Sequence, residues 1–335
     1  MSGGTDGETT LDVPGFADVE AAARRIASQV RRTPVVTSRE IDRLVGAEVA
    51  FKCENLQRSG AFKFRGASNA VLCLPEPAGP GGVCTHSSGN HGAALALAAR
   101  LRSIPATVVM PAGAPGVKRR AVESQGGEVV ECEPTLAARE AALRRVVEER
   151  GGRVIHPYDN FHVIAGQGTA ALELIDDPRP APWSEPLGGP VDALLVPVGG
   201  GGLLGGSALV GAKRGCRVYG AEPARADDAM RSLRAGRIIP VEAPDTIADG
   251  LRTSLGERNF AIIRREVEDI LTVSEESILA AMRLLFEHTK LVVEPSGAVP
   301  LAALLQHGPP RGSARVGVVL SGGNADLDAL GFPVA

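Results

Sequence analysis

The stretch "DALLVPVGGGGLLGG", residues 192–206, decides the fold. An apolar strand ends in four consecutive glycines, and "LLGGSALVGAKR" then begins a helix. Backbone N–H groups that no side chain shields, at the positive end of a helix dipole, favour a phosphate. A tight glycine turn that lets the helix pack closely is the alternative, although four glycines exceed what a turn requires. We therefore predict a phosphate site after a buried strand.

The same alternation of strand and helix extends along most of the chain. Apolar β-rich runs include "AEVAFKCE", "GVCTHS", "ATVVMP", "EVVECE", "RVIHP", "RVYGAE" and "RVGVVLS". Helical stretches such as "GAALALAARL" and "LAAREAALRRVVEERG" lie between them. Fully apolar strands alternating with helices are typical of parallel sheets covered on both faces. The sequence predicts an α/β protein.

The 335 residues are enough for two compact units. Clusters of proline and glycine at "LPEPAGPGG" and "DDPRPAPWSEPLGGP" mark exposed turns. We predict a flexible leader over residues 1–16, a large domain from 17–79 and 159–335, and a small mobile domain, 80–158, inserted between its two parts.

Composition narrows the classes of partner. The net charge is −3 and only 3% of residues are aromatic, so neither a basic footprint nor stacking platforms for nucleic acid are expected. No apolar run approaches the length of a membrane span, and the N-terminus lacks the features of a signal peptide. The five scattered cysteines form no C-x-x-C pair. We expect a cytoplasmic protein with neither membrane nor nucleic-acid partners.

The segment "NLQRSGAFKFRGASNA", residues 55–70, contains a lysine in an unusual setting. Lys63 stands between Phe62 and Phe64, among small residues, in a chain that otherwise uses arginine as its surface cation. Desolvation lowers a lysine pKa and makes the amine a nucleophile. A strand lysine whose stem lies between two core aromatics is the alternative.

Two further segments place polar side chains after predicted strands. "THSSGNHG", residues 85–92, supplies Ser87, Ser88, Asn90 and His91 at the start of a helix, a suitable site for a carboxylate, although either serine could simply cap the helix. "VVLSGGN", residues 318–324, adds Ser321 and Asn324 at the same predicted sheet edge. The carboxyl edge of an open α/β sheet is where ligands bind.

A dinucleotide site is the rival interpretation of the glycine loop. Gly200, Gly202 and Gly205 satisfy G-x-G-x-x-G, and Glu222 ends the next strand, where a ribose-binding acid would stand. That pattern would predict an oxidoreductase. However, such fingerprints usually lie on the first strand of their unit, and this one follows a large part of the chain.

A single desolvated lysine, a glycine loop and polar strand ends together suit pyridoxal 5'-phosphate. "KCENLQRSGAFKFRGA", "SSGNHG", "VGGGGL", "TIADGL" and "SGGN" occur in an order that resembles the fold-type II pyridoxal-phosphate enzymes, and in particular the serine/threonine dehydratase and serine racemase family. The resemblance covers about residues 17–330. It implies a tryptophan synthase β-like fold: two open twisted sheets covered by helices, with a smaller domain inserted in a larger one.

The resemblance also implies roles for individual residues. Lys63 would carry the cofactor and then remove the Cα proton, while Phe62 would pack on the pyridine ring, Asn90 would bind the ring hydroxyl and Ser321 would face the ring nitrogen. The phosphate cup would consist of Gly199, Gly200, Gly201, Gly202 and Leu203. Serine or threonine would lose water and then ammonia to give a 2-oxo acid. Ser87, Ser88, Asn90 and His91 resemble the loop that binds the substrate carboxylate.

Three features resemble the serine racemase and hydroxyaspartate dehydratase branch of this family. Ser88 matches an acid/base of the racemases, so racemisation stays open. Glu222, the Ala226 carbonyl and Asp228 match a divalent cation site for Mg²⁺, Mn²⁺ or Ca²⁺, although an acidic helix start is the commoner explanation. Arg139, otherwise an ordinary surface arginine, and Thr253 would face a second carboxylate, as in 3-hydroxyaspartate. The resemblance further implies a homodimer.

Overall fold

The computed structural model describes residues 11–87, 89–114 and 116–325. The larger of its two sheets has the order β1-β2-β10-β7-β8-β9 and is parallel except for the β1–β2 pair. Its strands are β1 (Val35–Val36), β2 (Glu48–Cys53), β7 (Ala193–Pro197), β8 (Arg217–Pro223), β9 (Asp269–Val273) and β10 (Arg315–Leu320). The sequence did not predict β1 or β9, which are short or only half apolar.

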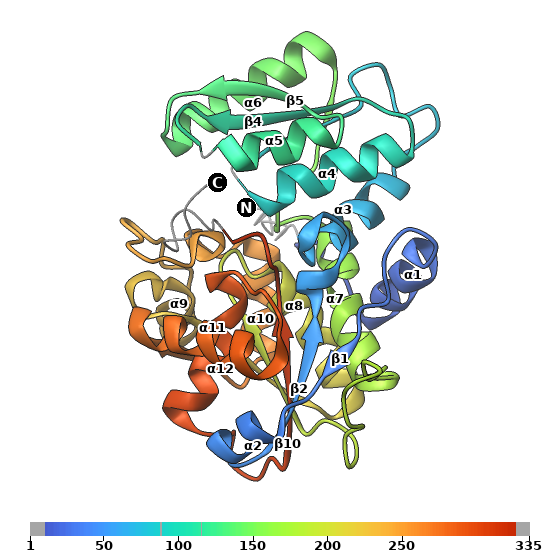
Figure 1. Cartoon of the computed structure of the whole chain (residues 1–335). Helices are drawn as coiled ribbons and strands as arrows, with labels where there is room; N and C mark the ends of the chain where they lie inside the picture. Colours follow the sequence, from blue (N-terminus) through green and yellow to red (C-terminus); the bar gives the residue numbers. More distant parts are fainter. Residues whose placement is uncertain (1–10, 88, 115, 326–335) are drawn as a thin grey trace, which may run out of the picture.

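Helices cover both faces of this sheet (Figure 1). One face packs on α1 (Phe16–Ile26), α7 (Phe161–Asp176), α8 (Gly202–Arg214) and α10 (Glu257–Glu266), and the other on α2 (Arg39–Val45), α11 (Glu275–Thr289) and α12 (Pro295–His307). Helix α9 (Asp228–Ala235) lies beside β9. Successive residues of β2 enter opposite cores, since Val49 and Phe51 pack on one side and Ala50 on the other.

The smaller sheet has the order β5-β4-β3-β6 and is wholly parallel. Its strands are β3 (Val83–His86), β4 (Ala106–Pro111), β5 (Glu128–Cys132) and β6 (Arg153–Val154). One face packs on α4 (Asn90–Leu101) and α5 (Gly116–Ser124), and the other on α6 (Leu136–Arg150). These strands lie consecutively between β2 and β7, so the smaller unit interrupts the larger one, which confirms the predicted fold class. The domain limits at 80 and 158, and the mobility of the smaller domain, stay predictions.

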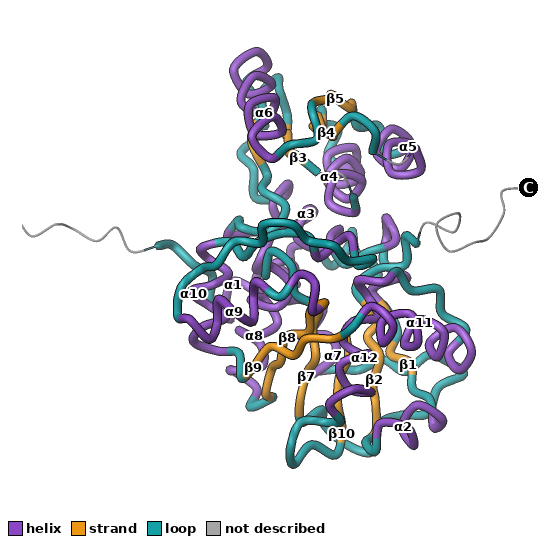
Figure 2. Tube along the Cα trace, turned by 90° about the vertical axis from the view of Figure 1, so that its left-hand side faces the viewer, coloured by secondary structure: helices purple, strands orange, loops and turns teal. Residues whose placement is uncertain are grey.

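Helix α3 (Lys63–Leu72) lies between the two units and packs on α4 of one and α7 of the other (Figure 2). Lys63 is its first residue. The alternative of a strand lysine is therefore wrong, because the chain turns into a helix directly after Phe62. Short 3-10 turns join the elements of the larger unit: η1 (Glu54–Leu56), η2 (Arg58–Gly60), η3 (Ala224–Ala226) and η4 (Asp249–Leu251).

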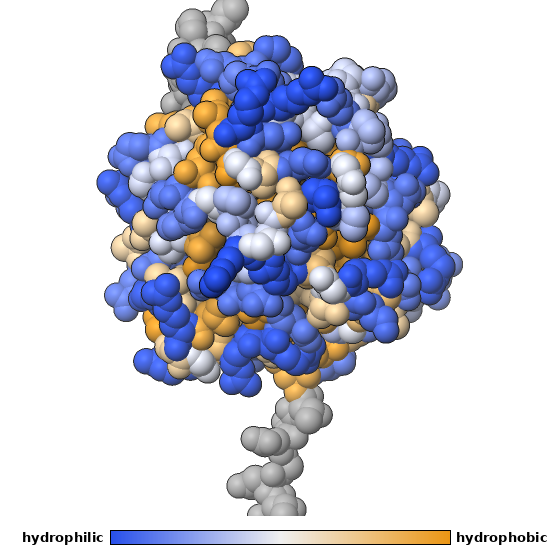
Figure 3. All heavy atoms as spheres, turned by 90° about the horizontal axis from the view of Figure 1, so that it is seen from below, coloured by the Kyte–Doolittle hydropathy of each residue, from blue (hydrophilic) through white to orange (hydrophobic). Residues whose placement is uncertain are grey.

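The predicted leader falls mainly on residues 1–10, which lie outside the described part, and Phe16 already belongs to α1. Among the described helices, none combines the length and apolarity needed to cross a membrane. Seen from below, hydrophilic residues cover most of the surface and apolar ones occur between them (Figure 3).

Candidate active site

A cavity of about 560 Å³ opens between the two units. It forms where β7 and β10 of the larger sheet and β3 of the smaller sheet end, because the carboxyl ends of parallel strands meet at one edge of their sheet. Nearly all the predicted cofactor and substrate residues line it: Phe62, Lys63, Ser87, Asn90, His91, Arg139, Gly199, Gly200, Gly201, Gly202, Leu203, Thr253 and Ser321. Ser88 lies outside the described residues. Glu222, Ala226 and Asp228 do not line this cavity.

The Lys63 amine lies in the cavity, and no carboxylate of the described residues is within hydrogen-bonding distance of it. Its Nζ donates to the Pro157 carbonyl at 2.9 Å and lies 5.1 Å from the centre of the Phe62 ring. Burial lowers the pKa of Lys63 to about 8, although the charge of Glu294 opposes this. A substantial fraction of the amine is therefore neutral, and nucleophilic, near pH 8.

The glycine loop follows β7 and forms the start of α8. Gly201 has a left-handed φ of 88°, and a Cβ on Gly200 would overlap with the ring of Tyr158. Both positions therefore require glycine. Asn259 Nδ2 donates to the Gly200 carbonyl at 2.6 Å and so fixes the turn.

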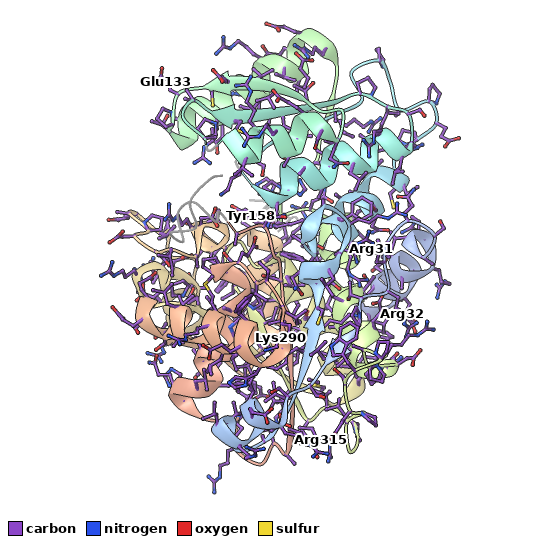
Figure 4. The ribbon with its side chains drawn as sticks, viewed as in Figure 1. Arg31, Arg32, Glu133, Tyr158, Lys290 and Arg315 are labelled. Atoms are coloured by element: carbon purple, nitrogen blue, oxygen red, sulfur yellow. The ribbon has the colours of Figure 1, made fainter. Side chains whose placement is uncertain are left out.

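The N–H groups of the glycine loop remain available for an anion. Within the described chain, no acceptor pairs with the N–H groups of residues 199–203. Tyr158, which the sequence analysis did not select, covers one side of the loop and lies between the two units (Figure 4). Unpaired N–H groups at a helix start suit a phosphate.

The start of α4 brings several polar groups to the opposite wall. Ser87 Oγ accepts from the N–H groups of Gly89 and Gly92 at 3.3 and 3.2 Å, so it stabilises the start of the helix as well as lining the cavity. His91 Nε2 lies 3.2 Å from the Ile155 carbonyl, and burial holds the pKa of His91 well below its usual value. A neutral His91 acts through hydrogen bonds rather than charge.

Arg139 reaches the cavity from α6. Its Nε is buried and has no hydrogen-bond partner among the described residues. Burial is the main cause of the lowered pKa of His86, and the positive charge of Arg139 is the second cause. The description as an ordinary surface arginine is therefore incomplete. Thr253 lies at the glycine loop, where its Oγ1 would be 3.1 Å from a Cβ on Gly199. That Arg139 and Thr253 face the same end of a substrate stays a prediction.

The predicted metal ligands form a separate buried group at the end of β8. Glu222 and Asp228 are each 1% exposed. Glu222 accepts from the N–H groups of Met230 at 2.7 Å and Ala229 at 3.3 Å, whereas Asp228 Oδ2 has no partner in the described structure. Among the described residues, no three histidine, cysteine or acidic side chains are placed so that together they could hold a metal ion, so a cation here would need carbonyl or water ligands too.

Further cavity residues were not assigned a role from the sequence. Glu294 and Asn324 contact Asn90, and Lys118 of α5 pairs with Asp249 of η4 at the cavity entrance. Asn324 could be found from the sequence because it ends the "SGGN" motif. Glu294 and Lys118 could not, because their partners Asn90 and Asp249 are distant from them in the sequence. Only the folded chain brings these pairs together.

Comparison with known proteins assigns the family. A model described as "Pyridoxal-phosphate dependent enzyme" matches residues 26–322. The β-hydroxyaspartate dehydratase of Paracoccus denitrificans is 45% identical and the match covers 95% of this chain and 98% of that protein. A serine racemase of Arabidopsis thaliana is also 45% identical, with 93% of each chain covered.

The solved structures agree with this assignment. The crystal structure of a threonine deaminase from T.th. superposes with a TM-score of 0.84 at 48% identity, covering 93% of this chain and 99% of that one. The family excludes the dinucleotide-dependent oxidoreductase, and Glu222 contacts the start of α9 rather than the cavity. This chain belongs to the pyridoxal-phosphate-dependent enzyme family.

Proposed function

We propose that the chain is a pyridoxal-phosphate-dependent ammonia-lyase that converts a β-hydroxy amino acid to a 2-oxo acid and ammonia. The observation that carries the proposal is the desolvated Lys63 amine beside a glycine loop with free N–H groups. The relatives named as dehydratase, racemase and deaminase support it. Because a racemase is equally similar, racemisation remains the second candidate.

The residues fit the cofactor. Lys63 would hold it covalently, residues 199–203 would bind its phosphate, and Phe62 would pack against its ring. Ser321, 2% exposed at the end of β10, would face the ring nitrogen as a neutral group. A neutral partner holds a proton on that nitrogen less firmly than an aspartate would, which favours elimination over transamination.

When bound, pyridoxal phosphate withdraws electrons from the α-carbon of an amino acid and so makes its proton removable. Lys63 would be the base that takes this proton, because the lowered pKa of its free amine leaves part of it neutral. Ser87 and His91 would bind the substrate carboxylate at the start of α4, Asn90 would bind the ring hydroxyl of the cofactor, and Ser88 would contribute as an acid/base.

Replacement of the lysine tests this function. We expect Lys63→Ala to retain its fold but to release no 2-oxo acid, since both the covalent attachment and the base are lost. Borohydride should fix the cofactor to Lys63 in the wild type. Lys213→Ala, on the exposed side of α8, is the matched control and should keep full activity. Substantial elimination by Lys63→Ala would contradict the proposal.

We propose 3-hydroxyaspartate as a substrate beside serine and threonine. The support is the buried Arg139 Nε without an acceptor, since a guanidinium in a closed site binds a second carboxylate strongly. Arg139→Ala should reduce kcat/KM for 3-hydroxyaspartate at least about 10-fold more than for serine. Arg144→Ala, exposed on the same helix, is the control. Equal losses for both substrates would make Arg139 structural.

We also propose a divalent cation, Mg²⁺ or alternatively Mn²⁺ or Ca²⁺, bound by Glu222, the Ala226 carbonyl and Asp228. The unpartnered Asp228 Oδ2 and the two buried carboxyl groups support it. Oxygen ligands of this kind suit hard cations, with water completing the coordination.

We also propose that the protein is a homodimer and that it is located in the cytoplasm. Leu279 and Phe286, two turns apart on α11, are 48% and 59% exposed, and such residues on one helix face favour burial by a partner. The five cysteines form no disulfide, which is usual for a reducing compartment. Light scattering should give twice the mass of one chain, and Phe286→Glu should lower it.

A further inference from the structure

A buried carboxyl group beside the cavity has no role in the mechanism above. Glu294 is the N-cap residue of α12, and 5% of it is exposed. None of the ion pairs found in the described residues includes it. A buried carboxyl group without a cation is costly, so its hydrogen bonds must compensate.

The side-chain hydrogen bonds to this carboxyl group come from Asn90, and the Asn324 backbone N–H contributes beside them. Asn90 Nδ2 donates to Glu294 Oε1 at 2.8 Å and to Oε2 at 3.1 Å. Asn90 is the first residue of α4 in the smaller unit, whereas α12 packs on the larger sheet. The contact therefore joins the two walls of the cavity. Gly322 leaves room for the carboxyl group, since a Cβ there would overlap with it.

A second amide holds the other end of Asn90. Asn324 Nδ2 donates to Asn90 Oδ1 at 2.9 Å and to the Ser59 carbonyl at 2.8 Å, which uses both of its hydrogens. A Cβ on Gly60 would overlap with Asn324 Oδ1, so glycine is needed there for this arrangement. The orientation of Asn324 is thus fixed from two sides.

The two contacts decide the orientation of the Asn90 amide. Its oxygen accepts from Asn324. The two carboxyl oxygens of Glu294 lie side by side, whereas the two N–H bonds of an amide diverge, so one N–H shared between the oxygens makes both contacts. A rotation of the amide by 180° would place its N–H groups against the Asn324 donor and its oxygen against the Glu294 acceptors. The second N–H has no acceptor in the described chain, and Asn90 lines the cavity. One donor is left over on the cavity wall.

We infer that Glu294 and Asn324 are positioning residues that hold the Asn90 amide so that its remaining N–H is ready for the ring oxygen of bound pyridoxal phosphate. The inference rests on the proposed function and on the contact with the ring hydroxyl that the family resemblance implies for Asn90. A donor fixed in advance costs less free energy to order on binding than one that must rotate into place.

The charge of Glu294 is not needed for this role. Burial raises the pKa of Glu294 to about 7, against the effect of the Asn90 hydrogen bond. A protonated carboxyl group keeps a carbonyl oxygen that accepts from Asn90, and a glutamine at this position would keep one as well. The acceptor, rather than the charge, is what positions Asn90.

Cofactor titration of the apoprotein tests the inference without using turnover. Pyridoxal phosphate is added to wild type, Glu294→Ala, Glu294→Gln and Asn324→Ala, and both the dissociation constant and the absorbance maximum of the bound cofactor are recorded. We expect Glu294→Ala to weaken binding about 10-fold and to shift the maximum, Asn324→Ala to weaken it about 3-fold, and Glu294→Gln to stay within about 2-fold of wild type. Glu275→Ala is the control, because this carboxyl accepts from the Ile247 N–H away from the cavity.

The variants separate a positioning role of Glu294 from an effect of its charge. Wild-type affinity and spectrum in Glu294→Ala would overturn the inference, and so would equal losses in the Ala and Gln variants, which would make the charge responsible. If Glu294→Ala does not fold, judged by the apoprotein melting temperature, unchanged binding by Asn324→Ala overturns it and the 3-fold loss supports it. A wild type that binds no pyridoxal phosphate would instead overturn the proposed function.

Discussion

Two groups of buried ionisable side chains in the larger unit differ in whether cations neutralise their carboxylates. The first joins β2, η1, α3 and α7 through two cations and two carboxylates: Lys52, Arg65, Glu54 and Glu173. Arg65 lies 2.7 Å from Glu54 and 2.8 Å from Glu173, and Lys52 lies 2.6 Å from Glu173. The second is the pair of acids at the end of β8, Glu222 and Asp228, which has no cation among its hydrogen-bond partners in the described structure.

The pKa values follow this difference. Burial disfavours the charge on Glu173, but Arg65 and Lys52 outweigh it and hold the pKa of Glu173 below its usual value. Burial raises the pKa of Glu222 to about 9 and that of Asp228 to about 7. Carboxylates that are paired with buried cations can stay ionised in the folded protein. Buried acids without such cations must instead bind protons or a metal cation.

Removal of Arg65 should have the largest effect. Arg65 is fully buried, and Arg65→Leu would leave Glu54 and Glu173 facing each other with one lysine. We expect a loss of about 3–5 kcal/mol in the free energy of unfolding, measured with urea. Arg39→Ala, which breaks an exposed pair with Glu185, is the control and should cost at most about 1 kcal/mol. Similar losses in both variants would refute the distinction.

Divalent cations should stabilise the second group by an intermediate amount. Mg²⁺ or Mn²⁺ at about 100 times its dissociation constant should add about 2.7 kcal/mol, and a chelator should remove this gain. Asp228→Asn should abolish the response while leaving the metal-free protein at least as stable as wild type, since a buried acid becomes neutral. Melting curves of wild type that ignore both metal and chelator would argue against the site.

The fold was predictable because its central strands are uninterrupted apolar runs that end in glycine or serine, as after Pro197 and Leu320. β1 was missed because two residues carry no periodicity. The cavity residues near the glycine loop were found because short motifs mark them. Glu294 was not, because "LVVEPSG" indicates only a helix start, while Asn90 lies 204 residues away. Burial and long-range pairing are properties of the folded chain.

The smallest effect, and the one that separates the two groups most clearly, is the pH dependence of stability. The raised pKa values of Glu222 and Asp228 mean that the folded, metal-free protein binds more protons than the unfolded chain above pH 4.5. Its stability therefore falls as pH rises from about 4.5 to about 9, with the share of Asp228 complete near pH 7 and that of Glu222 continuing to about 9. The lowered pKa of Glu173 acts in the opposite sense, since its contribution is present at neutral pH and is lost only in acid.

Between pH 5.0 and 8.0, we expect metal-free wild type to lose about 1 kcal/mol relative to Asp228→Asn, because relaxation and water around the acids reduce the full shift. Buried neutral histidines such as His156, whose pKa burial lowers to about 4, are common to both proteins, so their contribution cancels in the difference. Saturating Mg²⁺ should flatten the wild-type curve, since the cation replaces the protons. If the two metal-free proteins keep a constant difference across this range, Asp228 does not titrate there, and the second group is balanced by contacts in the fold as the first one is.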